Sequence, residues 1–208
     1  MMKLRHLGYL LLVALVAVAA PRPASAQDLA KDAGTFVQSL GDQAIQVITD
    51  KGLSPADREK KFHQIFVDHF DVPAIGRFVL GRYWRTASDA QKTEFLKLFE
   101  DMIVKTYNNR FTEYKGEQFV VTGSRADGDS AMVTTNVTRP GNNQPVKVDW
   151  RVLKPQGQLK IVDVVIEGVS MSVTQQQEFG SVIQRNGGQI DGLLATMRER
   201  VQQQSAKG

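Results

Sequence analysis

The chain has 208 residues, no cysteine, and 26 basic against 22 acidic residues. Without cysteine it can form no disulfide, no thiolate metal site and no cysteine nucleophile. Three of the basic residues and none of the acidic ones lie in residues 1–26, so the remainder is almost neutral. Because nucleic-acid binding depends on clustered positive charge, this composition argues against that class of function.

Residues 1–26 have the three-part pattern of a secretory signal peptide. A short positive start is followed by an almost wholly apolar run over residues 7–20 and by an Ala24-Ser25-Ala26 cleavage site. The apolar run is too short to span a bilayer comfortably, which takes about 20 residues. We therefore expect residues 1–26 to be cleaved and residues 27–208 to form one exported domain.

Helical periodicity dominates the chain from residue 28 to residue 114. Apolar residues recur at helical spacing over residues 28–50. Ser54-Pro55 is typical of the N-cap and first position of a second helix, which carries four apolar residues on one side. Pro73 ends that helix and begins a short segment over residues 73–80, and Ser88 begins a long helix to about residue 114.

After residue 116 the pattern changes to the alternation of strands. Turn signals divide this region into four segments, of which the last is apolar on both faces, as in a central strand. The predicted strands cover residues 117–123, 130–139, 145–153 and 158–167, and two further helices cover 172–186 and 188–203. The order of elements predicts an α+β fold in which helices wrap a curved, four-stranded antiparallel sheet shaped as a cup.

Catalytic signatures are weak in this chain. The segment Gly168-Val169-Ser170-Met171-Ser172 approaches the nucleophile elbow of hydrolases but lacks its second glycine. His63 and His69 are six residues apart and point to different sides of a helix, so they do not form a metal pair. Asp163 lies within an apolar strand; it is a candidate general base, or it pairs with a residue such as Arg151.

Several segments, taken in order, resemble the periplasmic MlaC-like family, also called the toluene-tolerance auxiliary component family. These are Phe70–Trp84, the run from Ala90-Gln91 to Phe99, Tyr107, and especially Glu167–Met171. Asp149-Trp150, Asp163-Val164, Phe179, Ile183, Gly187-Gly188 and Leu193-Leu194 follow the same order. The resemblance covers nearly all of residues 28–203. A branch of the same superfamily is associated with hopanoid synthesis, and these residues do not separate the two branches.

The resemblance implies a nuclear-transport-factor-like sheet with an N-terminal helical subdomain. It implies a monomeric periplasmic carrier of phospholipid without enzymatic activity, whose partners are an outer-membrane lipoprotein complex and an inner-membrane ABC transporter. It brings no cofactor other than the cargo lipid, and no metal. Residues 27–115 would form the mainly helical part, 116–168 the sheet and 169–204 the C-terminal helices. A small isomerase or hydrolase with Asp163 as base is the alternative from another class.

The pocket residues are inferred from their facing and position, although the same apolar faces also fit ordinary core. The predicted lipid-binding residues are Phe78, Tyr83, Phe95, Phe99, Met102, Ile103, Val133, Val148, Trp150, Val164, Ile166 and Met171. Arg82 and Arg85, which lie in an aromatic turn, are the predicted head-group rim. The helices of residues 28–70 are the predicted movable wall.

Overall fold

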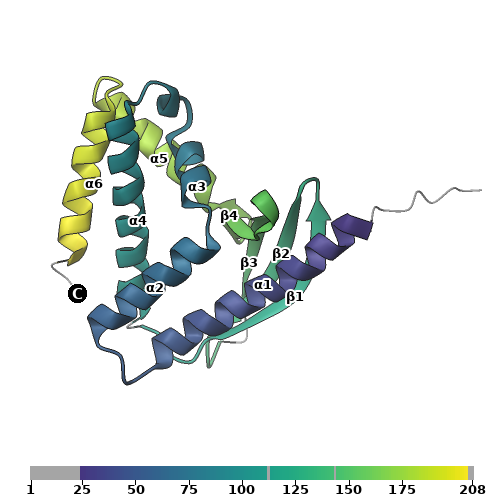
Figure 1. Ribbon diagram of the computed structural model, residues 1–208. Coiled ribbons are helices and arrows are strands. Elements are labelled where there is room, and N and C mark those ends of the chain that lie inside the picture. Colours follow the sequence, from purple (N-terminus) through teal and green to yellow (C-terminus); the bar gives the residue numbers. More distant parts are fainter. Residues whose placement is uncertain (1–23, 112, 143, 206–208) are drawn as a thin grey trace, which may run out of the picture.

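The computed structural model describes residues 24–111, 113–142 and 144–205. Within them lie six α-helices, two short 3-10 helices and five strands (Figure 1). The helices are α1 (Ala24–Thr49), α2 (Pro55–His69), α3 (Val72–Leu80), η1 (Gly81–Arg85), α4 (Asp89–Phe111), η2 (Pro155–Gly157), α5 (Met171–Arg185) and α6 (Ile190–Ser205). The strands are β1 (Gln118–Asp127), β2 (Ser130–Thr138), β3 (Val146–Leu153), β4 (Lys160–Ile166) and β5 (Val169–Ser170).

The predicted signal peptide lies outside the described residues except for its last three, which belong to the first turn of α1. In the part of the chain that the structure covers, no helix is both long and apolar enough to cross a membrane.

Side-chain caps explain where several helices begin. The Ser54 hydroxyl accepts a hydrogen bond from the Asp57 N–H at 3.1 Å, and Pro55 opens α2 as predicted. At the start of α4, the Ser88 hydroxyl accepts from the Gln91 N–H while the Gln91 side chain accepts from the Ser88 N–H. This reciprocal capping box places the helix start within one residue of the prediction.

The sheet is an antiparallel meander in the order β1-β2-β3-β4-β5. The α+β class with a curved antiparallel sheet is confirmed, but the prediction of four strands omitted β5. Glu167 and Gly168 both have positive φ and turn the chain back, so that Val169 pairs with Ile166 at the edge of the sheet. A strand of two residues is too short to show any alternation, which is why the sequence pattern did not predict it.

Two apolar cores lie on either side of α2. One joins α1 and Ile65 of α2 to the inner face of the sheet, and the other joins Phe66 of α2 to α3, α4, α5 and α6. Figure 1 shows α1 lying along β1 and β2, with the α4–α6 group on the other side of α2. The helical layer therefore combines residues 72–111, which precede the sheet, with residues 171–205, which follow it. The two cores leave space between them.

Candidate functional site: an apolar cavity between the two cores

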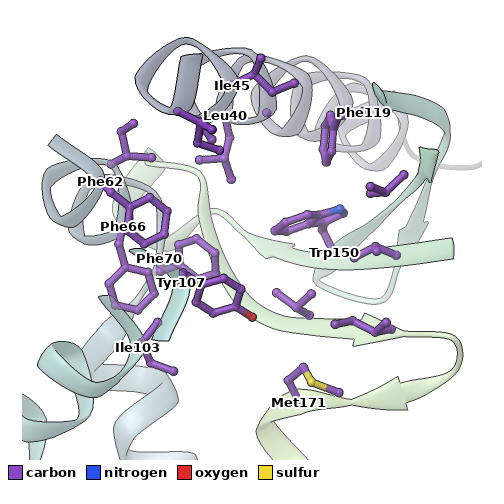
Figure 2. A pocket seen from close by; sticks show the side chains of 18 of the residues that line it. Leu40, Ile45, Phe62, Phe66, Phe70, Ile103, Tyr107, Phe119, Trp150 and Met171 are labelled. Atoms are coloured by element: carbon purple, nitrogen blue, oxygen red, sulfur yellow. The ribbon is translucent and has the colours of Figure 1, made fainter. Parts of the chain in front are cut away.

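A cavity of about 590 Å³ lies between the sheet, α1, α2 and α4, within the size range of ligand-binding pockets (Figure 2). Most of its described lining residues are apolar or aromatic. The lining consists of Leu40, Gly41, Ala44, Ile45, Ile48, Phe62, Ile65, Phe66, Phe70, Ile75, Val79, Phe99, Ile103, Tyr107, Glu113, Tyr114, Glu117, Gln118, Phe119, Val137, Arg139, Val148, Trp150, Asp163, Val164, Ile166, Met171, Ser172 and Gln175.

Strands β3 and β4 supply the floor of the cavity. The register places Trp150 opposite Val164 and Val148 opposite Ile166, so these four side chains share one face. The Trp150 indole N–H donates to the Thr135 hydroxyl at 2.9 Å, which orients the ring. Because the polar atom of Trp150 already has a partner, the ring offers the cavity an apolar surface.

Aromatic residues of α2 and α4 form the opposite wall. The ring centroids of Phe66 and Phe70 lie 4.8 Å apart, and those of Phe62 and Tyr107 lie 6.3 Å apart across the two helices. Ile103 adds an aliphatic side chain from α4, and Figure 2 shows these residues gathered on one side of the cavity. An aromatic and aliphatic wall of this kind suits a hydrocarbon ligand.

One end of the cavity is polar and open to solvent. The Arg139 guanidinium is 2.9 Å from a Glu117 carboxylate oxygen, and its side chain is 58% exposed. The other Glu117 oxygen accepts from the Lys115 N–H at 2.8 Å. This backbone hydrogen bond, helped by the Arg139 contact, holds the pKa of Glu117 below its ordinary value of 4.5. Glu113 lies in the same connection and also lines the cavity.

Seven of the predicted pocket residues line this cavity, although whether they bind lipid stays a prediction. They come from α4, β3, β4 and the start of α5, and they are Phe99, Ile103, Val148, Trp150, Val164, Ile166 and Met171.

The other predicted pocket residues lie elsewhere. Phe95, Met102 and Val133 are buried in the two cores, where Phe95 packs edge-on against the Phe179 ring. Phe78 is 46% exposed on α3. Periodicity placed these residues on apolar faces. The apolar stripe of α4 is broad, so part of it faces the core and part faces the cavity.

The predicted rim also lies elsewhere. Tyr83, Arg82 and Arg85 line a separate hollow of about 490 Å³ near the start of α6. Arg82 is engaged locally, with its guanidinium 2.9 Å from the Tyr83 hydroxyl. Among the described residues that line the apolar cavity, the cation is Arg139, which follows β2 directly. It is the last residue of the predicted strand 130–139, where the alternating pattern did not single it out.

The predicted pocket residues included none of the lining side chains from α1, α2 and β1. The helices of residues 28–70 were predicted as a movable wall, but none of their side chains was among the predicted pocket residues. The missed lining residues include Leu40, Gly41, Ala44, Ile45, Ile48, Phe62, Phe66, Phe70 and Phe119.

Asp163 holds the junction between β4 and α5. Its carboxylate accepts hydrogen bonds from the Ser170 hydroxyl at 2.6 Å, the Ser172 N–H at 3.0 Å and the Val164 N–H at 2.9 Å. Arg151 does not pair with it and instead contacts Asp127 at 2.8 Å. With both oxygens engaged in this way, Asp163 is a structural acceptor, and the structure does not favour the general-base alternative.

The two histidines have local partners. His63 contacts Glu100 between α2 and α4, and the His69 Nδ1 lies 2.8 Å from the Ile65 carbonyl oxygen. Among the residues described, no group of three or more histidine and acidic side chains is arranged to hold a metal ion.

Comparison with known proteins assigns the sequence to one family and the fold to a known structure. The sequence pattern of the MlaC protein family matches residues 38–199, and the chain belongs to this family. The solved phospholipid-binding protein of Ralstonia solanacearum has the same fold: the two superpose with a TM-score of 0.74 at 24% identity, over 83% of this chain and 98% of that one. That structure was determined in complex with a phospholipid.

Two curated relatives are similar in sequence. The intermembrane phospholipid transport system binding protein MlaC of Haemophilus influenzae is 26% identical over 139 residues, which span 65% of this chain and 64% of the relative. The toluene tolerance protein ttg2D of Pseudomonas putida is 27% identical over 200 residues, which span 93% of this chain and 89% of the relative.

Proposed function

We propose that this protein is a lipid carrier that buries the acyl chains of a phospholipid in the cavity between its two cores. The observation that carries the proposal is a cavity of about 590 Å³ whose walls are apolar and whose open end is polar. An amphiphile with hydrocarbon chains and a charged head group matches that distribution. Support also comes from the relatives, one named for intermembrane phospholipid transport and one solved with a phospholipid.

Hydrocarbon burial supplies the driving force. Each CH₂ group removed from water contributes about 0.8 kcal/mol, so a long acyl chain is held firmly without any directional contact. The walls offer aromatic rings and aliphatic side chains and leave few polar atoms facing the chains. This task needs no nucleophile or general base, and we propose that the protein is not an enzyme and that the lipid is its cargo.

We propose the periplasm as the place of this transport. The supporting observations are the signal-peptide pattern of residues 1–26 and membership of the MlaC family. The proposed partners are an inner-membrane ABC transporter and an outer-membrane lipoprotein complex, with the carrier acting as a monomer between them. Maintenance of outer-membrane lipid asymmetry and solvent tolerance would follow. A hopanoid is the alternative cargo, because an apolar cavity also accepts fused hydrocarbon rings.

The test is to identify what the protein carries. The full chain is expressed for export, purified without detergent and examined by native mass spectrometry, followed by lipid extraction. We expect one phospholipid per protein, whereas a bound hopanoid would replace the cargo but keep the carrier role. A protein that is empty and takes no lipid from phospholipid vesicles would contradict the proposal.

Neighbouring residues of β4 provide a matched pair of variants. Ile166 lines the cavity, whereas Val165 is half-buried, outside the cavity lining and opposite Asp149 in the sheet. We expect Ile166→Glu to lose most of its lipid, because a charge among acyl chains is strongly unfavourable. Val165→Glu should keep its lipid, and circular dichroism of both variants checks that the fold is intact.

A further inference from the structure

The open end of the cavity carries charges of both signs. Arg139 follows β2, and Glu113 and Glu117 lie in the connection between α4 and β1. The Tyr114 hydroxyl donates to the Glu117 carbonyl oxygen at 3.1 Å, which folds this connection back on itself. The described lining residues at this end therefore present one cation beside two carboxylates.

The rest of the cavity determines how a lipid must lie. Acyl chains are stabilised against the aromatic and aliphatic walls, so the phosphate and its substituent have to reach the polar end. Arg139 is exposed enough to meet a phosphate, and guanidinium groups bind phosphate with paired hydrogen bonds. A head group placed there meets the two carboxylates as well.

We propose that this end of the cavity selects lipids whose head group joins a phosphate to a cationic amine over lipids whose head group is net anionic. The inference rests on the proposed function and adds a specificity to the same site. The phosphate pairs with Arg139, and the amine lies against the carboxylates of Glu117 and Glu113. The Glu117–Arg139 pair is thus opened by the head group, and each partner receives a new counter-charge.

Charge balance explains the discrimination. A zwitterionic head group replaces the Glu117–Arg139 ion pair by two new pairs, phosphate with Arg139 and amine with Glu117, so every charge keeps a partner. A net anionic head group also brings its phosphate to Arg139, but it has no amine, so the carboxylate of Glu117 is left beside the phosphate without a cation. Glu117 is ionised at neutral pH as an ordinary glutamate is, and the Lys115 N–H, which donates to its carboxylate, lowers its pKa further. The groups are partly exposed, so solvent limits the size of the effect.

The experiment is a competition between two head groups on identical acyl chains. The protein is incubated with vesicles that contain equal amounts of palmitoyl-oleoyl phosphatidylethanolamine and palmitoyl-oleoyl phosphatidylglycerol, and is then separated and extracted. We expect the ethanolamine lipid to be enriched about two- to fivefold, the range of exposed ion pairs.

Two variants should move this ratio in opposite directions. Glu117→Gln removes one of the two carboxylates that face the amine and should lower the ratio toward one. Arg139→Gln removes the partner of the phosphate, so total uptake should fall while the ratio rises. The control is the Glu94–Arg198 pair, which joins α4 to α6 at 2.6 Å outside the cavity lining. Glu94→Gln and Arg198→Gln should leave the ratio unchanged.

The outcomes separate the two proposals. If the two lipids bind in equal amounts, or if Glu117→Gln does not change their ratio, the head-group selection is overturned and the carrier role remains. A protein that takes up neither lipid overturns the carrier role itself.

Discussion

Gly41 allows β1 to pack closely against α1. A Cβ atom at this position would lie 2.3 Å from the Phe119 ring, and Gly41 itself lines the cavity. Phe119 in turn packs edge-on against Trp150, with ring centroids 6.0 Å apart. A glycine within a helix normally weakens it by about 0.5–1 kcal/mol relative to alanine. At position 41 the glycine leaves room for the Phe119 ring, which forms part of the cavity wall.

Gly41→Ala tests this relationship. The added methyl group has to displace the Phe119 ring, which we expect to reduce lipid occupancy severalfold and to cost about 1–3 kcal/mol of stability. The matched control is Gly180→Ala in α5, where the added Cβ meets nothing within 4 Å and should stabilise the helix. Native mass spectrometry measures occupancy and urea unfolding measures stability. Equal behaviour of the two variants would contradict the role of Gly41.

Single residues also show how far the sequence predicted the site. Val148 and Trp150 line the cavity, and alternation along β3 assigns both to one face. Val164 and Ile166 also line it, but β4 is apolar on both faces, so its sequence pattern alone does not separate them from Val165. Phe95 was assigned to the same pocket as Phe99, although only Phe99 reaches it. Helical periodicity identifies a buried stripe, but it does not say which part of a wide stripe faces a neighbouring helix and which part faces a cavity.

Among the elements, α1 is the wall that covers the sheet. It packs on β1, β2 and α2, and residues 50–54 join it to α2. Gly34 of α1 lies directly over Ser124 of β1, where an added Cβ would be 3.6 Å from the serine Cβ. The sequence prediction that residues 28–70 form a movable wall is still untested, and this contact offers a way to test it.

A disulfide between α1 and β1 tests the movement. The Cβ separation of 3.6 Å falls within the usual range of 3.5–4.5 Å for disulfides, and the chain has no other cysteine to compete. We expect the oxidised Gly34→Cys/Ser124→Cys variant to exchange lipid with fluorescent phospholipid vesicles at least about tenfold more slowly than its reduced form.

Each single-cysteine variant is the control, and neither should respond to oxidant. An oxidised double variant that exchanges lipid at the unlocked rate would show that α1 need not leave β1, and that the chains pass elsewhere.

For the whole molecule, the division into two cores has an energetic consequence. Ile65 belongs to one core and Phe66 to the other, so α2 connects them while the cavity keeps them apart elsewhere. Without a ligand, the lining side chains lack packing partners on one side, which costs dispersion contacts. A bound acyl chain restores those contacts and joins the two cores into one.

Lipid binding should therefore stabilise the whole fold. At a free lipid concentration 100 times the dissociation constant, linkage predicts about 2.7 kcal/mol of added stability. For a chain of this size that corresponds to a rise of about 5–10 °C in the unfolding midpoint. Differential scanning calorimetry of lipid-loaded and delipidated protein measures the shift, with Ile166→Glu as the control that should show none. Identical midpoints for the two forms would contradict a ligand that fills the cavity.

The sequence by itself determined the order of the long elements, the α+β class and the inner face of β3. These depend on local chemistry: a Ser-Pro cap begins α2, and alternation orients β3. Only the tertiary structure decided that α1 covers β1 and β2 and that Arg139 stands at the open end of the cavity. A cavity is the space that separate segments leave between them, so it depends on packing among distant residues, which periodicity along one segment does not contain.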